Sequence, residues 1–211
     1  MKRICKTTIF DYRADYDVTA AIYTGMTNAH LKALYFEWHF YRGYLKNKMI
    51  KLDKDESVLD QFQWDWNWNE VITPHIVENP GPGVYSVRWG SSTPLESHKC
   101  RILGLIKLKP GTSKLPGQEP LLLIDTLIVA PWHRTHVLSL CEDKPMFKGV
   151  GTALMDFAKR RSKEMGFGGR LGVDPKGNSH GFFEKCGMTY YPPEDRFEDG
   201  WCQYDPPQVA A

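Results

Sequence analysis

The chain has 211 residues, of which 42% are hydrophobic, so it is long enough to bury a core and fits one domain better than two. Its net charge of +2 and pI near 8.2 are too mild to argue for binding to nucleic acid or to an anionic membrane. No apolar stretch approaches the roughly 18 residues that span a bilayer, and residues 1–6 lead into polar residues instead of an apolar signal core. We therefore expect a cytoplasmic protein.

The N-terminal part predicts one long helix. Residues 6–23 contain β-branched and aromatic residues without a clean period and are assigned as strand or irregular. Asn28 is suited to cap a helix that runs to about Lys48. Apolar and aromatic residues at helical spacing give this helix one face that favours packing against a core: Leu31, Leu34, Tyr35, Trp38 and Tyr41.

Tryptophans alternate with polar residues in the next segment, residues 61–69. Alternation at period two places Trp64, Trp66 and Trp68 on one face of an extended segment. A packed strand is one interpretation, and a platform that stacks on a sugar, a base or a cation is the other. The adjacent charges, Asp65 and Glu70, do not favour nucleic acid.

Glycine and proline breakers divide the rest of the chain into strands. The breaker at 78–83 precedes probable strands at 84–89 and 100–109, and a second breaker at 110–120 precedes an apolar strand at 121–129. These strands predict an antiparallel meander that leads into an α/β unit. That unit comprises a helix opened by residues 148–154, a strand at 170–173 and a short helix at 179–185; residues 201–204 are suited to a last strand.

The start of the helix near residue 150 has the features of a phosphate-binding loop. Free amides at a helix start lie at the positive end of the helix dipole and can donate to a pyrophosphate. Gly149 and Gly151 lack Cβ atoms, so the backbone can take positive φ values there, and Lys148 adds a positive charge. A glycine pair before a helix is often only a turn device, so its context has to support the phosphate interpretation.

Three segments together resemble the GNAT (Gcn5-related) N-acetyltransferases. They are Val129-Ala130-Pro131 at the end of a strand, the loop and helix start at residues 149–155, and residues 182–188, which read Phe-Phe-Glu-Lys-Cys-Gly-Met. The resemblance covers about residues 100–191. It implies one α/β (α+β) domain over residues 1–211, with a mixed, largely antiparallel sheet flanked by helices. Residues 1–82 form a divergent N-terminal part, and residues 83–205 form the sheet and the acyl-CoA-binding part.

The resemblance also implies the substrates and the binding residues. Acetyl-CoA is the acyl donor, and the acceptor is a primary amine of a small molecule or peptide that attacks directly in a ternary complex. The amides of Ile128 and Val129 hold the pantetheine arm and polarise the thioester where the strand splays from its neighbour. The pyrophosphate is held by Arg134, by Lys148 with backbone amides, or by both. The amides belong to Gly149, Val150, Gly151, Thr152 and Ala153. Early helices border the acceptor pocket in this family, so the aromatic face of the helix at 28–48 can touch substrate as well as pack on the core. Homodimers are common in the family.

The chain departs from the family pattern at three places. Met146 stands where the family usually has Arg or Gln, and residues 132–147 lengthen the connection before the loop. We interpret this insertion as a loop that folds over the cofactor or acceptor, or as a surface insertion packed by its own apolar residues. Phe183 replaces the tyrosine that often serves as general acid, so that role cannot be transferred.

Candidate acid and base residues follow from burial and position. Asp125 shares a strand face with Leu127 and Val129, and burial among apolar residues would raise its pKa toward a useful range for a base. The alternative is an aspartate satisfied by the backbone or by a neighbouring cation, or one that faces water. Tyr190 is the candidate acid, although a structural role is more common for such a residue.

No metal site is expected. The cysteines are odd in number, widely spaced and without a CxxC pair, so they form neither a disulfide framework nor a zinc pattern; they are Cys5, Cys100, Cys141, Cys186 and Cys202. His133 and His136 have no second cysteine pair beside them. The competing functions are a non-catalytic acyl-CoA-binding or regulatory protein of the same fold and, more weakly, a carbohydrate- or ligand-binding module that uses the tryptophan segment.

Overall fold

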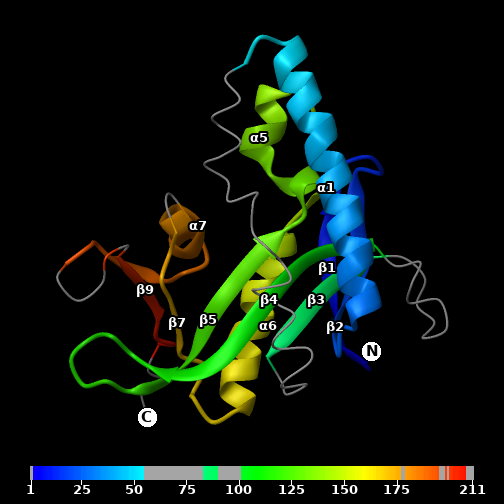
Figure 1. Cartoon of the computed structure of the whole chain (residues 1–211). Coiled ribbons are helices and arrows are strands. Elements are labelled where there is room, and N and C mark those ends of the chain that lie inside the picture. Colours follow the sequence, from blue (N-terminus) through cyan, green and yellow to red (C-terminus); the bar gives the residue numbers. More distant parts are fainter. Residues whose placement is uncertain are drawn as a thin grey trace. The chain divides into compact units, whose positions relative to one another are not determined.

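A computed structural model describes residues 2–54, 83–89, 101–176, 179–194, 198 and 200–207 (Figure 1). The predictions for the tryptophan segment 61–69, for the breaker at 78–82 and for the turn after Trp89 lie outside these residues. The helices are α1 (Asn28–Lys51), α5 (Thr135–Leu140), α6 (Val150–Glu164), α7 (His180–Lys185) and the 3-10 helix η2 (Pro131–His133). The strands are β1 (Lys2–Asp11), β2 (Tyr16–Thr24), β3 (Val84–Trp89), β4 (Arg101–Thr112), β5 (Pro120–Val129), β6 (Phe147–Lys148), β7 (Leu171–Val173), β8 (Thr189–Tyr191) and β9 (Trp201–Tyr204).

The strands form one mixed sheet of nine strands in the order β6-β1-β2-β3-β4-β5-β7-β9-β8. β5 and β7 pair in parallel. The pairs β1–β2, β1–β6, β2–β3, β7–β9 and β8–β9 are antiparallel. The parallel pairing of β5 with β7 follows from the crossover through α6, because parallel neighbours need a connection long enough to hold a helix. The predicted class, an α/β fold with a mixed, largely antiparallel sheet flanked by helices, is confirmed.

The chain divides into two compact units, and each is described by itself. The first comprises Met1–Leu105 and Ile128–Ala153, and the second comprises Ile106–Leu127 and Leu154–Ala211. The strands β4 and β5 and the helix α6 each run through both units.

In the first unit, α1 covers a core of apolar and aromatic side chains. Leu34 and Trp38 are buried, as the helical spacing predicts, and pack with Ile102, Ile128 and Trp132. The helix cap differs from the prediction: Thr27, not Asn28, is the N-cap residue, and its amide donates to Nδ1 of His30 at 3.2 Å. The predicted strand at 6–23 is in fact two strands, β1 and β2, joined by a turn between Asp11 and Tyr16.

The insertion 132–147 folds into η2, α5 and β6 and packs on the C-terminal half of α1. Leu45 and Met49 of α1 form a buried cluster with Leu138 and Cys141 of the insertion. Asp143 accepts a hydrogen bond from Tyr44 Oη at 3.2 Å and pairs with Lys48 Nζ at 2.5 Å. The ends of the insertion meet, because the Met146 amide donates to the Trp132 carbonyl at 2.9 Å. The insertion is therefore a packed part of this unit.

In the second unit, Trp201 fills the core below β7. Trp201 is fully buried against Leu121, and its Nε1 donates to Gln203 Oε1 at 3.1 Å. A Cβ at Gly172 would lie 2.4 Å from the Trp201 ring, so the indole needs a glycine there. The breaker expected at 110–120 begins later than predicted, since β4 continues through Pro110 to Thr112.

Among the described residues, the helices are each too short or too polar to cross a lipid bilayer.

Candidate functional site

The start of α6 presents unused backbone amides. Gly149 takes a φ of +86°, and the Ala153 amide closes the first helical hydrogen bond on the Gly149 carbonyl at 2.8 Å. The amides of Val150, Gly151 and Thr152 precede that bond, so they have no acceptor within the helix and lie at its positive end. This helix start can accept an anion such as a phosphate.

The two glycines of the loop play different parts. A Cβ added at Gly149 would meet nothing within 4 Å, so the space in front of the turn is open to a ligand. The expected positive φ is found at Gly149. It is not found at Gly151, because α6 already begins at Val150 and Gly151 has helical geometry in its first turn.

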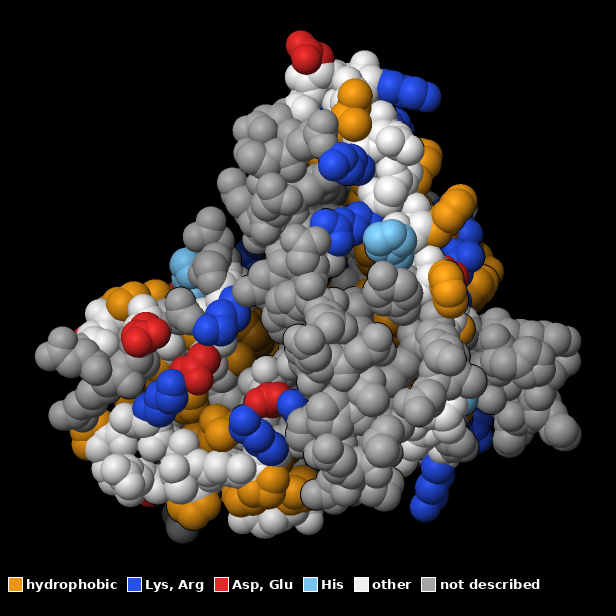
Figure 2. Space-filling model, viewed as in Figure 1, with side chains coloured by type: hydrophobic (Ala, Val, Ile, Leu, Met, Phe, Trp, Pro, Cys, Tyr) orange, Lys and Arg blue, Asp and Glu red, His pale blue; other side chains and the backbone are white. Residues whose placement is uncertain are grey.

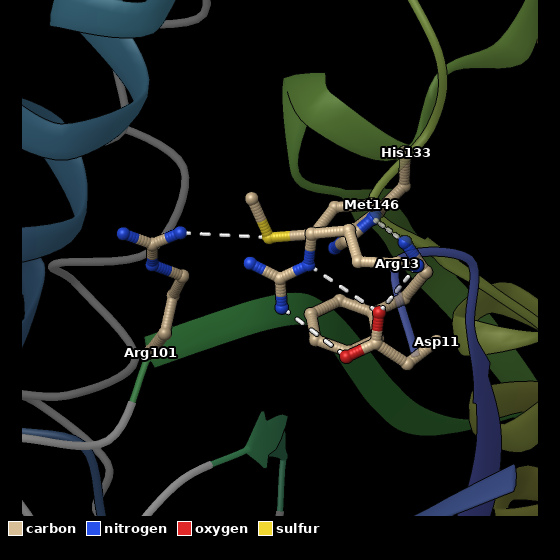
Figure 3. A network of polar contacts seen from close by, with 6 residues as sticks. Asp11, Arg13, Arg101, His133 and Met146 are labelled. Carbon is tan, nitrogen blue, oxygen red and sulfur yellow. Dashed lines mark hydrogen bonds and ion pairs between the residues drawn. The ribbon is translucent and has the colours of Figure 1, made fainter. Parts of the chain in front are cut away.

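His133 fixes the strand that leads into this turn. The Phe147 amide donates to His133 Nδ1 at 3.2 Å, and the two rings lie 5.5 Å apart (Figure 3). Burial, helped by the Arg101 charge, lowers the pKa of His133 to about 3, so the ring is neutral at pH 7. With Nδ1 accepting, the proton resides on Nε2, which is buried without a hydrogen-bond partner among the described residues.

An ion pair between a buried carboxylate and an exposed guanidinium supports β6 from β1. The Arg13 guanidinium contacts the Asp11 carboxylate at 3.2 Å and lies over the Phe147 ring at 5.4 Å (Figure 3). Burial alone would raise the pKa of Asp11, but the hydrogen bonds and charge of Arg13 outweigh it and lower that pKa. Asp11 and Phe10 also pair with Phe147 and Lys148 through the backbone. The residues before the α6 turn are thus held from two sides.

Two cations belong to the segments that lead into this turn. Lys148 is exposed at the end of β6, immediately before Gly149. Arg134 follows His133, whose ring binds the Phe147 amide, so Arg134 belongs to the segment that is fastened to β6. Burial lowers the pKa of Arg134 to about 10, and the guanidinium therefore keeps its charge at neutral pH. The role of both residues in holding phosphate stays a prediction.

The end of β5 supplies one amide that is turned away from β4. The Ala130 amide donates to the Leu103 carbonyl of β4 at 2.8 Å. Successive amides of a strand point to opposite edges, so the Val129 amide points away from β4 and the Ile128 amide points toward it. Within the described residues, the β5–β7 register comprises Leu122 with Leu171 and Leu123 with Gly172, six residues before Val129. Of the two predicted amides, Val129 has the orientation that a ligand needs.

Asp125 lies on the predicted face of β5 but in a different electrostatic environment. Its side chain is half-buried and forms ion pairs with both Lys107 and Lys109. Burial would raise the pKa of Asp125, but hydrogen bonds and charges from the two lysines lower it. The expected rise in this pKa is therefore wrong. The geometry matches the alternative, an aspartate satisfied by neighbouring cations.

Tyr190 and the short helix α7 lie in the second unit. Tyr190 is half-buried on β8 and stacks on His180, with ring centroids 4.6 Å apart. Phe183 is buried on α7. Cys186 caps the end of α7, where burial raises the pKa of its thiol. Tyr190 remains the candidate acid, because Phe183 has no proton to donate.

A pocket of about 590 Å³ lies in the first unit, between α1 and the insertion. Its walls include Phe40 and Tyr41 of α1, Arg101 at the start of β4, Trp132 of η2 and Met146. The sequence predicted that the aromatic face of this helix, which includes Tyr41, could also touch substrate, but it did not identify Phe36 and Phe40 as wall residues. The available signal for these two was their spacing of four residues, which places both rings on one side of a helix.

Within the described parts of the chain, no group of three or more His, Cys, Asp or Glu side chains is arranged to hold a metal ion.

The chain is thus a mixed α/β protein in which a glycine turn leads into the helix α6. No family model matches the chain, and no curated protein matches it in sequence. Similar solved structures include the N-acetyltransferase YlbP of Bacillus subtilis in complex with coenzyme A, at 18% identity and a TM-score of 0.42, covering 72% of this chain and 91% of that one.

Two further similar structures come from a toxin and from an insect protein. One is a mutant AtaT toxin bound to the C-terminus of the antitoxin AtaR, at 15% identity and a TM-score of 0.44, covering 71% of this chain and 78% of that one. The other is the insect protein named arylalkylamine N-acetyltransferase 7, from the yellow fever mosquito, at 11% identity and a TM-score of 0.43, covering 96% of this chain and 94% of that one. All three likenesses are distant. The features that bear on function are those of the chain itself.

Proposed function

We propose that this chain is a GNAT-type N-acetyltransferase that binds acetyl-CoA and transfers the acetyl group to a primary amine. The observation that carries the proposal is the turn at Gly149, with its open space and positive φ, directly before the free amides of α6. The pyrophosphate would accept from these amides and pair with Lys148 and Arg134. The residues present fit the donor, because they combine amides, two cations and a glycine turn without a side chain in the way.

The chemistry needs few side chains. The neutral amine attacks the thioester carbonyl and forms the carbon–nitrogen bond. The carbon–sulfur bond then breaks as CoA leaves as a thiolate, and the nitrogen gives up one proton to solvent. The Val129 amide, which points away from β4, would donate to the thioester oxygen and stabilise the charge that develops there. A thiolate of pKa about 8.5 leaves without strict need for an acid. The catalytic roles of Asp125 and Tyr190 stay predictions.

Direct attack by the amine is favoured over an acyl-cysteine intermediate. Burial raises the pKa of Cys141 and of Cys186, and it raises that of Cys202 to about 11. These thiols are protonated at neutral pH, whereas a nucleophilic cysteine needs a lowered pKa.

Two measurements test the function. Acetyl-CoA should bind in calorimetry, and free thiol should appear when an amine from a panel of polyamines, aminoglycosides, amino acids, aromatic amines and peptides is added. Binding without thiol release on any amine would favour a non-catalytic acyl-CoA-binding protein. Absence of acetyl-CoA binding would contradict the proposal altogether.

A matched pair of glycine variants tests the phosphate role. Gly149 and Gly166 both have a φ of +86°, and a Cβ at either meets nothing within 4 Å. Gly149→Ala and Gly166→Ala should therefore both cost about 1–2 kcal/mol of stability through backbone strain. Only Gly149→Ala should weaken acetyl-CoA binding, because it distorts the helix start. Equal affinities for the two variants would count against the site.

A further inference from the structure

The pocket between α1 and the insertion has walls of aromatic rings. The Trp132 ring meets the Tyr41 ring edge-on, with centroids 5.4 Å apart, and meets Trp38 in the same manner at 6.3 Å. Burial raises the pKa of Tyr41 to about 12, so its hydroxyl stays protonated. Edge-on packing holds Trp132 in one orientation, and the pocket therefore has a fixed aromatic floor.

The outer wall of this pocket exposes two large apolar side chains. Phe36 is 71% exposed and Phe40 is 83% exposed, one helical turn apart on α1. Figure 2 shows hydrophobic side chains at the surface along this helix. Exposed aromatic rings beside a pocket favour a ligand that covers them, because water contact with apolar surface is unfavourable.

One anion and one cation complete the walls. Arg101 Nε contacts Glu37 Oε1 at 2.8 Å, and the guanidinium lies over the Trp132 ring at 5.3 Å. Arg101 also donates to Met146 Sδ at 3.5 Å (Figure 3). Arg101 is thus fixed by three partners, while the Glu37 carboxylate, with its side chain 37% exposed, can accept further hydrogen bonds from an amine.

The pocket lies close to both parts of the proposed acetyl-CoA site. Trp132 is three residues after Val129, and Met146 is three residues before Gly149. Three residues span at most about 11 Å, so the pocket walls lie within that reach of the strand end and of the phosphate turn. Trp132 and Met146 thus connect the pocket along the chain to the end of β5 and to the turn at Gly149.

We propose that this pocket binds the acceptor, and that the acceptor is a primary alkylamine that also carries an aromatic ring. The inference rests on the proposed acetyltransferase function and names the substrate class for that site. The ring packs against Phe40, Tyr41 and Trp132, and the amine nitrogen donates to Glu37. An arylalkylamine and an aromatic amino acid share this chemistry, and only the second would also use Arg101 through its carboxylate.

Direct binding tests the inference separately from turnover. Phenylethylamine, tyramine, phenylalanine, butylamine and spermidine are titrated by calorimetry into the full chain with saturating CoA. The aromatic amines should bind at least about tenfold more tightly than the aliphatic ones. Phenylalanine binding more tightly than phenylethylamine would identify the amino acid, and the reverse would identify the arylalkylamine.

Phe40→Ala and Tyr16→Ala form a matched pair for the same titration. Both residues are exposed aromatics, at 83% and 60%, and Tyr16 lies at the start of β2, outside the pocket walls. Phe40→Ala should weaken phenylethylamine binding about tenfold with an unchanged melting temperature, and Tyr16→Ala should leave binding unchanged. Equal affinity of butylamine and phenylethylamine, or no effect of Phe40→Ala, would overturn the inference.

The acceptor-pocket proposal and the acetyltransferase proposal can fail separately, and each failure gives a different result. Thiol release on aliphatic amines without aromatic preference would leave the acetyltransferase standing and remove the pocket assignment. Binding of phenylethylamine that depends on Phe40, without thiol release on any amine, would keep the pocket as a ligand site and contradict the acetyltransferase proposal.

Discussion

At the residue scale, the Asp125 ion pairs predict a pH-dependent contribution to stability. Because the folded pKa of Asp125 is lowered, its ionised form stabilises the protein above the unfolded pKa, near 3.9, and this contribution is lost as the pH falls through the folded pKa. Asp125→Asn should cost about 1–3 kcal/mol at pH 7, because it leaves the buried Lys107 without its anion. In urea titrations, the difference from wild type should shrink below about pH 4.

Asp174 provides the control for Asp125. It pairs with Lys114, but its side chain is 45% exposed, so Asp174→Asn should change stability by less than about 1 kcal/mol. Equal losses of unfolding free energy in the two variants would show that burial of the Asp125 ion pairs does not contribute to stability.

His133 predicts a second pH effect, from a buried neutral ring. Its pKa falls from 6.5 to about 3 on folding, so the unfolded chain binds a proton that the folded chain does not. Stability should therefore fall by about 1.4 kcal/mol per pH unit as the pH drops from 6.5 toward 3. His133→Asn keeps an acceptor near the Phe147 amide and should remove this slope, whereas the exposed His39→Asn should keep it. A parallel decline in both variants would contradict the assignment.

A residue-scale test of the acid uses neighbouring tyrosines. Tyr190→Phe should lower kcat about 10²- to 10⁴-fold if Tyr190 protonates the leaving thiolate. Tyr191→Phe is the control, since Tyr191 packs against the Leu121 and Trp201 cluster. Unchanged kcat in Tyr190→Phe would leave the stacked pair with His180 as a structural contact.

At the element scale, α5 depends on its contacts with α1. Leu138 is fully buried in the cluster with Leu45 and Met49, so Leu138→Ala should cost about 2–5 kcal/mol. Leu140 of the same helix is half-buried, so Leu140→Ala should lower the free energy of unfolding clearly less. Chemical denaturation compares the two directly, and equal losses would mean that α5 is not anchored through Leu138.

This dependence explains why the insertion was harder to predict than the helix that follows it. α6 has a glycine turn, fifteen residues and a regular apolar face, which together identify a helix from sequence. η2 and α5 have three and six residues, too few for a period to be read, and their conformation is set by packing on α1. The cap of α1 was misplaced by one residue because Thr27 and Asn28 are both suited to that position.

At the scale of the whole molecule, local patterns predicted the central strands, while distant contacts determined the rest. β3, β5, β7 and β9 follow from apolar runs bounded by breakers. β1 and β2 were not separated, because most of β1 is exposed and shows little alternation of buried and exposed residues. The candidate phosphate turn is local and could be predicted. The pocket is assembled from α1, β4, η2 and Met146, which no local pattern connects.

Three elements shared by the two compact units predict that the chain unfolds cooperatively. Gly172→Ala places a Cβ 2.4 Å from the buried Trp201 ring in the second unit and should cost about 1–3 kcal/mol through overpacking. Since β4, β5 and α6 run through both units, we expect the amides of β1 and β2 to lose exchange protection together with those of β7 and β9.

Gly43→Ala supplies the comparison in the first unit. A Cβ at Gly43 meets nothing within 4 Å inside α1, so this change should stabilise the chain by about 0.5–1 kcal/mol. Protection in both units should rise with Gly43→Ala and fall with Gly172→Ala, since one transition governs both. If Gly172→Ala lowers exchange protection in β7 and β9 alone, the two units unfold separately despite the strands and helix that they share.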